Sequence, residues 1–274
     1  MMSKRFFTTE ISESKFENNH LRYVTVKSNN LGGRGDMTIF VPKGLEKTHG
    51  DIPIVTLLHG VYGSHWAWTM KAGVHWIAQR MIDMAEIAPM CIVMPSDGLF
   101  YDGSGYLKHQ EKNFESWITE DVLDATRELI SCVSDRSPAF IAGLSMGGYG
   151  ALRLGAKYPQ RYEGFSGLSS ITKFREIESF YEKDTFGKLD NQVPEPESVL
   201  EIIIANRATL KPFRFDCGKD DSLFQSNKEL SLALNSHGIS HQFEANEGKH
   251  EWVYWENNIG KTLQFFHELA SKAN

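Results

Sequence analysis

Ser145 has the sequence neighbours of a nucleophile. It stands at the centre of Gly143-Leu144-Ser145-Met146-Gly147, after the apolar run PAFIA and before the helical pattern YGALRLGAKYP. A strand, a GxSxG turn and a helix form a nucleophile elbow, whose tight turn requires glycines around the serine and leaves the hydroxyl exposed. The amide of Met146 would point from the helix N-terminus towards negative charge beside the serine. A plain glycine-rich turn is the alternative, but the strand and helix on either side favour catalysis.

A serine hydroxyl needs a base that removes its proton, and His250 is the histidine best placed for this role. Four histidines follow Ser145 in the chain, at positions 237, 241, 250 and 267. Only His250 comes after a predicted strand, HQFEA, and before a predicted helix. The others lie at a helix end, at the start of a strand and inside the last helix. We therefore predict that His250 is the base, with a purely structural histidine as the alternative.

The acid that orients the base should follow the predicted strand FRFDCG, which leaves Asp220 or Asp221. Both lie in the same loop, and their spacing does not choose between them. Asp216 lies within the apolar run and is a weaker choice. A second oxyanion donor should follow the early strand IVTLLHG, so the amide of Val61 or Tyr62 is expected to take that role. His59, the histidine of this run, is interpreted as a buried structural residue.

The elements that must position these residues follow from the apolar pattern. From residue 52 onwards, short apolar runs alternate with segments of helical spacing, which predicts parallel strands with helices on both faces of one sheet. Two earlier runs, LRYVTVKS and DMTIFVP, predict an antiparallel hairpin. Ligands bind beyond the carboxyl ends of such parallel strands, where the residues named above lie. The strands are predicted within 21–28, 36–42, 52–60, 90–98, 138–148, 162–170, 213–221 and 241–245, and the helices within 75–88, 117–133, 149–159, 222–238 and 262–272.

We predict a single α/β domain over residues 1–274, with one long break in the alternation at about 172–212. This break contains LDNQVPEPESV and LEIIIANRATLKP, and we expect it to form a cap-like insertion over the site. The helical stretch LEIIIANRATL could bind a second copy of the chain, or its isoleucines could belong to the core. A homodimer is therefore one expectation for the assembly.

The composition limits the classes of partner and compartment. A formal charge of -6 gives no general attraction to nucleic acid or to an anionic membrane. The three cysteines are far apart and form no CxxC pair, which favours a reducing compartment. The N-terminal residues lack the apolar core of a signal peptide, and no stretch approaches the roughly 20 apolar residues of a membrane span. We expect a cytoplasmic protein.

Four motifs, in order along the chain, resemble those of the esterase D family of α/β-hydrolases: LLHGVYGSHWAW, GLSMGGYGAL, CGKDDSLF and EGKHEWVYW. This family includes S-formylglutathione hydrolases, tributyrin-type esterases, feruloyl esterase domains and mycolyltransferases. The resemblance covers about residues 20 to 270 and implies the α/β-hydrolase fold. It also implies that Asp221 is the catalytic acid and His250 the base, and that the amides of Met146 and Val61 are the oxyanion donors.

The resemblance implies a serine carboxylesterase that acts on short acyl esters. A formyl thioester of glutathione and a carbohydrate acetyl or feruloyl ester are alternative substrates, although SDGLFYDGSGYLKHQEKNFESWITED lacks a clear match to the glutathione-specific members. A binding domain without catalytic activity is a remote alternative, because folds do not determine function. No HExxH, GxxxxGK[ST] or strand-linked GxGxxG motif is present, so neither a metal nor another cofactor is expected.

Several aromatic residues in or beside these motifs are expected to contact substrate: Tyr62, Trp66, Tyr101 and Trp252. For Trp66, packing in the core is an equally valid interpretation. The stretch DGLFYDGSGY also has two aspartates, Asp97 and Asp102, at a loosely calcium-like spacing. It lacks the ordered ligands of an EF-hand loop. We favour a loop at the rim of the pocket, with Tyr101 or Tyr106 lining the alcohol side.

Overall fold

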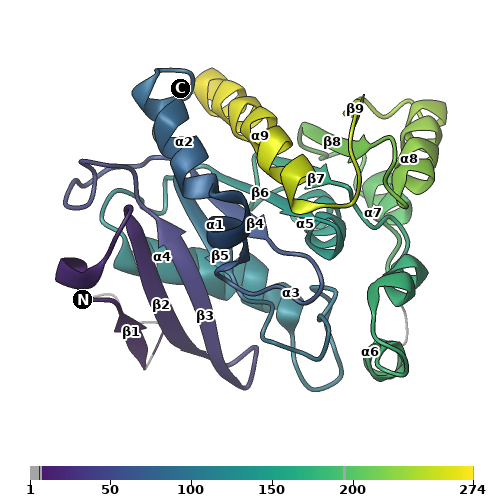
Figure 1. Ribbon diagram of the computed structural model, residues 1–274, viewed down its shortest axis with the longest axis horizontal. Coiled ribbons are helices and arrows are strands. Elements are labelled where there is room, and N and C mark those ends of the chain that lie inside the picture. Colours follow the sequence, from purple (N-terminus) through teal and green to yellow (C-terminus); the bar gives the residue numbers. More distant parts are fainter. Residues whose placement is uncertain (1–5, 7, 194–195, 274) are drawn as a thin grey trace.

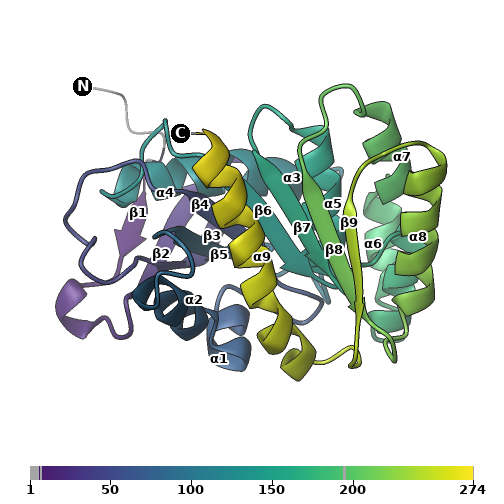
Figure 2. The same ribbon diagram turned by 90° about the horizontal axis from the view of Figure 1, so that it is seen from above.

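The computed structural model describes residues 6, 8–193 and 196–273, and its centre is a nine-stranded sheet with the order β1-β2-β3-β5-β4-β6-β7-β8-β9. Figures 1 and 2 show this sheet running through the molecule with helices on both sides. The six strands from β5 to β9 are parallel, and β1, β2 and β3 are antiparallel to their neighbours. The strands are β1 (Thr9–Ile11), β2 (Leu21–Ser28), β3 (Gly33–Phe40), β4 (Ile54–Leu58), β5 (Cys91–Pro95), β6 (Ala139–Leu144), β7 (Gly164–Leu168), β8 (Phe213–Gly218) and β9 (Gln242–Asn246).

The parallel strands form where the sequence has continuous apolar runs. Every residue of β4, β5, β6, β7 and β8 is buried, as expected for strands covered on both faces. The outermost strand β9 is more exposed, and β2 alternates between buried and exposed positions because one of its faces meets the core. The predicted hairpin is present as β2 and β3, and the predicted mostly parallel α/β sheet is confirmed.

Two layers of helices cover the two faces of the sheet. On one face, α1 (Ala67–Ala72), α2 (Val74–Asp83) and α9 (Trp252–Ala273) bury their apolar residues against the strands. The other face is covered by the run α3 (Phe114–Ser116), η2 (Trp117–Val122) and α4 (Leu123–Leu129), together with α5 (Met146–Lys157) and α8 (Phe224–Ser236). The run from Phe114 to Leu129 is continuous, with a π-helical turn in its middle. Among the described residues, no helix is both long and apolar enough to cross a lipid bilayer.

The segment between β7 and β8 holds three short helices: η3 (Phe174–Phe180), α6 (Phe186–Gln192) and α7 (Val199–Ala205). α7 packs beside the nucleophile-bearing helix α5 and buries Val199 and Ile203 in the core. In Figure 1, α6 lies at the lower right, below α7 and α8. This is the segment for which the sequence predicts an insertion, and its first part reaches the residues described next.

Candidate active site

Ser145, His250 and Asp221 meet at the carboxyl ends of the parallel strands. Ser145 directly follows β6, Asp221 lies in the loop after β8, and His250 lies in the loop after β9. The Nε2 atom of His250 is 3.0 Å from the Oγ atom of Ser145, and its Nδ1 atom is 2.9 Å from Oδ2 of Asp221. With Nδ1–H donating to the carboxylate, Nε2 is left to accept the serine proton. The three residues form one continuous chain of hydrogen bonds.

The turn at Ser145 holds the serine in a strained conformation. Its φ is 54° and its ψ is -117°, values that L-residues rarely adopt and that cost about 1–3 kcal/mol. The turn is closed on both sides by backbone contacts, because a Cβ atom on Gly147 would lie 2.5 Å from the carbonyl oxygen of Leu58. A Cβ atom on Gly143 would overlap the Gly147 backbone. Close approach of two chain segments therefore explains both glycines of the GxSxG motif.

Backbone hydrogen bonds connect the loop after β8, which carries Asp220 and Asp221, to the loop after β9, which carries His250 and is called the histidine loop below. The amide of Asp220 donates to the carbonyl of Gly248 (3.0 Å), and the amide of Lys219 donates to the carbonyl of Asn246 (2.8 Å). This arrangement turns the exposed Asp220 outwards and the side chain of Asp221 inwards, where it is fully buried. Of the two aspartates left open by the sequence, the structure places Asp221 against the histidine.

A second buried group supports the histidine loop from behind. The hydroxyl of Tyr254 donates to Oδ1 of Asp216 (2.8 Å), and Oδ2 of Asp216 is 2.9 Å from Nη1 of Arg214. The Tyr254 ring lies against Gly248, where φ is 132° and a side chain would collide with the ring. Asp216 thus fixes Tyr254, and the Tyr254 ring in turn supports the histidine loop at Gly248. The sequence did not predict this positioning role for Asp216.

Near Ser145, the amide of Val61 has no acceptor among the described residues, and the same holds for the amide of Met146, which is the first residue of helix α5. The neighbouring amide of Tyr62 donates to the carbonyl of Asp102 (2.9 Å), so it is already occupied. Between the two positions predicted for the second oxyanion donor, only Val61 keeps a free N–H in this part of the structure. His59 is a buried structural residue, since its Nδ1 donates to the carbonyl of Gly60 (2.7 Å) and its Nε2 accepts from the amide of Asp97 (3.1 Å).

The loop that follows β5 forms part of the rim, and its aspartates hold the chain in place. Asp97 accepts hydrogen bonds from the amides of Leu99 (3.1 Å) and Ser104 (2.7 Å). Asp102 accepts from the amide of Glu182 (2.9 Å) and from the hydroxyl of Thr185. Across the described part of the chain, no cluster of three or more histidine, cysteine or acidic side chains could hold a metal ion. Through these hydrogen bonds, the carboxylates hold the rim loop and connect it to the insertion.

The first part of the insertion lies over the histidine. The ring of Phe180 is 4.8 Å from that of His250, centroid to centroid. Next to it, the hydroxyl of Tyr181 donates to the carbonyl of Gly103, and burial raises the pKa of Tyr181. Gly103 in turn packs on the sulfur of Met146 so closely that a side chain there would overlap it. The insertion and the rim loop thus meet beside the nucleophile.

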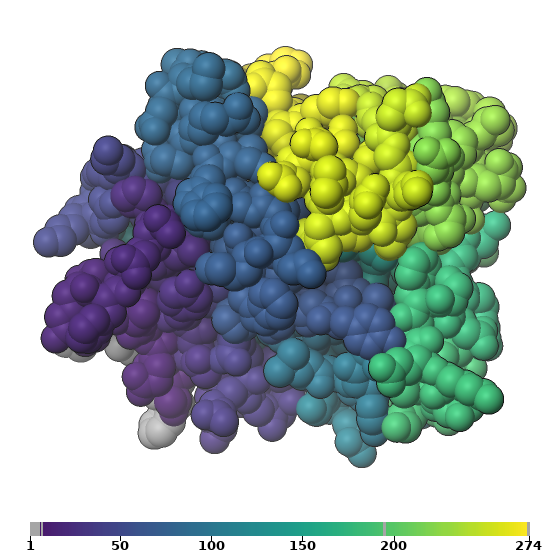
Figure 3. Space-filling model, viewed as in Figure 1, coloured from purple at the N-terminus to yellow at the C-terminus, as the bar shows by residue number. Residues whose placement is uncertain are grey.

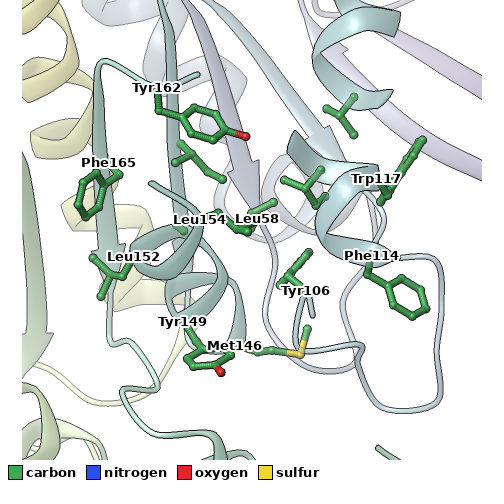
Figure 4. Close-up of a cluster of buried hydrophobic side chains, with 14 of the residues drawn as sticks. Leu58, Tyr106, Phe114, Trp117, Met146, Tyr149, Leu152, Leu154, Tyr162 and Phe165 are labelled. Atoms are coloured by element: carbon green, nitrogen blue, oxygen red, sulfur yellow. The ribbon is translucent and has the colours of Figure 1, made fainter. Parts of the chain in front are cut away.

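The four aromatic residues expected to contact substrate occupy different surroundings. Trp252 packs edge-to-face on Trp255 (5.2 Å between centroids), whose ring lies 5.0 Å from that of His250. Tyr62, Trp66 and Tyr101 are all largely exposed, Tyr62 and Tyr101 on the rim and Trp66 at the start of α1. Of the two tyrosines expected to line the alcohol side, Tyr101 or Tyr106, the structure rules out Tyr106, because this residue is fully buried and its hydroxyl donates to the carbonyl of His59 (2.9 Å). Figure 4 shows Tyr106 beside Met146 and Tyr149 in the core under α5.

A buried ionic network fixes the helix that follows Ser145. Arg153, on α5, is fully buried and binds Glu115 of α3 and Glu197, the residue before the N-cap of α7. The same guanidinium donates to the carbonyl of Tyr106 (2.5 Å). Burial alone would raise the pKa of Glu115, but the Arg153 guanidinium and neighbouring donors lower it to about 2. The network joins the nucleophile helix, the rim loop and the insertion.

We expect Arg153→Met to lower the free energy of unfolding by about 3–5 kcal/mol, because it leaves two carboxylates without their buried partner. Urea denaturation at pH 7 measures this loss. Since the folded-state pKa of Glu115 is lowered from 4.5 to about 2, its contribution is complete above pH 4.5 and is lost as the pH falls towards 2. The variant should lack this acid-dependent loss. Lys157→Met, which removes a partly exposed cation from the same network, is the control and should cost about 1 kcal/mol or less.

Comparison with known proteins identifies the family to which this chain belongs. Residues 28–266 match the model of the family named Esterase, described as "Putative esterase". An acetyl esterase from Caldicellulosiruptor saccharolyticus is 27% identical over 231 residues, which cover 78% of this chain and 83% of that protein. A solved ferulic acid esterase has a TM-score of 0.76 at 24% identity, covering 96% of this chain and 100% of its own. An S-formylglutathione hydrolase from Staphylococcus aureus has a TM-score of 0.73 at 20% identity, covering 90% and 98%.

The structural likenesses show the α/β-hydrolase fold, and the family match extends from the end of β2 into α9. Both agree with the resemblance to the esterase D family carried by the four sequence motifs. The chain belongs to the Esterase family and is a carboxylic ester hydrolase of the serine type.

Proposed function

We propose that Ser145, His250 and Asp221 are the catalytic triad of this esterase. The observation that carries the proposal is the continuous hydrogen-bond chain from the Ser145 hydroxyl through the His250 ring to the buried Asp221 carboxylate. Asp221 is itself oriented by the amide of Leu223, which donates to its Oδ1 (2.8 Å). A nucleophile, a base and a group that fixes the base are the parts that acyl transfer through serine requires.

In this mechanism, the Oγ atom of Ser145 attacks the ester carbonyl while Nε2 of His250 takes the hydroxyl proton. The negative charge on the tetrahedral intermediate is stabilised by the amides of Val61 and Met146, which have no other acceptor in the described structure. The imidazolium formed on His250 is stabilised by Asp221 and then protonates the leaving alcohol. The same histidine next activates a water molecule, which releases the acid from the acyl-enzyme.

We propose short acyl esters as substrates. The packing of Gly103, Met146 and Tyr181 beside Ser145 restricts the space next to the nucleophile, and Phe180 covers the histidine. The relative from Caldicellulosiruptor saccharolyticus, an acetyl esterase, is consistent with a small acyl group. Feruloyl esters and S-formylglutathione are the competing substrates, since solved structures of similar fold carry those activities in their names.

Turnover of a graded ester series tests this substrate class. We expect kcat/KM for p-nitrophenyl acetate or butyrate to exceed that for the octanoate ester by at least about tenfold, because methylenes that the site does not accommodate lower the binding of the transition state. Measurements on a feruloyl ester and on S-formylglutathione complete the series. Faster turnover of octanoate would contradict the short-acyl assignment. A preference for ferulate or S-formylglutathione would move the enzyme to that substrate class while leaving the triad chemistry intact.

A further inference from the structure

Asp102, on the rim loop, contacts two other segments of the chain that border the active site. Its backbone carbonyl accepts from the amide of Tyr62 (2.9 Å), in the loop after β4. Its carboxylate accepts from the amide of Glu182 (2.9 Å) and from the hydroxyl of Thr185, both in the insertion. Figure 3 shows the insertion, in green at the lower right, beside the bluer atoms of the rim loop. Asp102 therefore joins segments that are distant from one another in the sequence.

The bond to Tyr62 holds residues 59–63, which carry Val61 and are called the oxyanion loop below. Tyr62 has a φ of 57°, a conformation that is unfavourable for a residue with a side chain and persists where the surroundings impose it. Its side chain is 56% exposed, so burial in the core does not impose it. Within the described chain, the bond to Asp102 is the backbone hydrogen bond that connects residues 61–63 to a distant segment. This bond therefore helps to orient the Val61 amide, which directly precedes Tyr62.

The carboxylate of Asp102 holds the turn between η3 and α6. Both donors bind the same oxygen, Oδ2, and the amide of Thr185 also donates to the carbonyl of Glu182 (3.1 Å) within the turn. Hydrogen bonds to a charged acceptor are about twice as strong as those between neutral groups. The contact with Asp102 is therefore a strong attachment of this turn to the rim loop.

The segment just before this turn lies over His250. The ring of Phe180 is 4.8 Å from that of His250, centroid to centroid, and is tilted by 35° from it. Tyr181, which follows Phe180, donates from its hydroxyl to the carbonyl of Gly103. Since the next residue of the insertion binds Asp102, two consecutive contacts with the rim loop hold Phe180 in this place. Movement of Phe180 away from His250 would strain both of them.

We propose that Asp102 is a positioning residue that couples the position of the insertion over His250 to the orientation of the Val61 amide. The path runs from Thr185 to the Asp102 carboxylate, and from the Asp102 carbonyl to Tyr62 in the oxyanion loop. Oxyanion donors must lie within about 3 Å of the developing charge, so a small shift of this loop lowers the rate. Asp102 acts through these neighbours and not on the substrate itself. The inference rests on the proposed function, in which Val61 donates to the oxyanion.

Amide hydrogen exchange tests the coupling without any substrate. Thr185→Val removes the hydroxyl that binds Asp102 but keeps the branched shape, whereas Thr185→Ser keeps the hydroxyl. In Thr185→Val, we expect the peptide that contains Tyr62 to exchange at least about threefold faster than in the wild type, because its amide loses a fixed acceptor. Thr185→Ser should exchange like the wild type. Faster exchange confined to the insertion in Thr185→Val would overturn the coupling.

Asp190→Ala is the matched control, because it breaks a contact within the insertion. The Asp190 carboxylate accepts from the guanidinium of Arg175 (3.1 Å), which also belongs to the insertion. We expect unchanged exchange in the oxyanion loop of this variant. Equal acceleration there in Asp190→Ala and Thr185→Val would overturn the proposal, since any loosening of the insertion would then have the same effect.

Kinetics then connect the coupling to the reaction. Asp102→Ala should lower kcat for p-nitrophenyl acetate about tenfold with little change in KM, because the oxyanion donors act in the transition state. Asp102→Asn, whose amide oxygen can still accept both hydrogen bonds, should recover most of this loss. Ki for phenylboronic acid should rise about tenfold in Asp102→Ala, since its tetrahedral adduct with Ser145 places an oxygen in the oxyanion hole. Thermal unfolding checks that all variants are folded.

Wild-type kinetics in Asp102→Ala, or a rise in KM with unchanged kcat, would overturn the proposal, because the second result is expected of a residue that only shapes the substrate pocket. A fall in kcat with unchanged Ki for phenylboronic acid, or with no recovery in Asp102→Asn, would also overturn it. A wild-type protein that neither hydrolyses esters nor binds phenylboronic acid would contradict the proposed function instead. The exchange rates would then still decide whether Asp102 couples the insertion to the oxyanion loop.

Discussion

Ser145→Ala is expected to lower kcat for p-nitrophenyl acetate by at least about 10⁴-fold while leaving the fold intact. The loss is large because triad members act as a unit, and the remaining histidine and oxyanion donors cannot form an acyl-enzyme without the serine oxygen. Burst kinetics and labelling by a fluorophosphonate should disappear together with turnover. Thermal unfolding should change little, because alanine keeps both the Cβ atom and the strained φ of 54°.

Ser169→Ala is the matched control for this experiment. Ser169 follows β7 as Ser145 follows β6, it is fully buried, and its φ is also positive at 46°. Its removal therefore tests whether loss of any buried serine at this edge of the sheet has the same effect. We expect activity within about threefold of the wild type, as for most residues that do not act in the chemistry. Equal losses in the two variants would show that Ser145 acts through structure and not as the nucleophile.

The sheet was predictable from the sequence wherever burial imposed a strong pattern. β6 is buried on both faces, so its apolar run and the glycines that follow located the strand and the elbow together. β1 spans three residues at the edge of the sheet and is mainly exposed, so its sequence has no apolar signature. The short helix α6 was missed for a similar reason, since only two of its residues are buried. In these elements, contacts with the rest of the chain decide the structure, and a local pattern cannot show such contacts.

The site was predictable where one local motif decides each residue, and not where distant segments meet. Asp220 and Asp221 are neighbours in one loop, and the choice between them depends on hydrogen bonds to the histidine loop. The network of Arg153 with Glu115 and Glu197 joins residues 38 and 44 positions apart. The sequence did contain an indication of this ionic network, because Arg153 interrupts the apolar helix GYGALRLGA. Arginine is almost never fully buried without a partner, so an acidic residue could have been expected nearby.

Asp221→Asn is expected to lower kcat for p-nitrophenyl acetate by about 10³ to 10⁴-fold. An amide in place of the carboxylate can donate to Nδ1 of His250, which favours the tautomer with the proton on Nε2 and leaves no base facing the serine. The altered side chain also no longer stabilises the imidazolium that forms during attack. Measurement of kcat between pH 5 and 9 should show activity recovering in part at high pH, where hydroxide can replace the base.

Asp220→Asn supplies the control, because it makes the same chemical change one residue earlier in the chain. The side chain of Asp220 is exposed, and this residue contacts the histidine loop through its backbone amide, not through its carboxylate. We expect it to retain at least about a third of wild-type activity, as surface substitutions away from the chemistry usually do. A large loss in Asp220→Asn with a small loss in Asp221→Asn would reverse the assignment. Comparable large losses in both would mean that the tie between the two loops, and not the Asp221 carboxylate, sets the position of the base. The pair therefore separates the chemical role of the acid from the structural role of its loop.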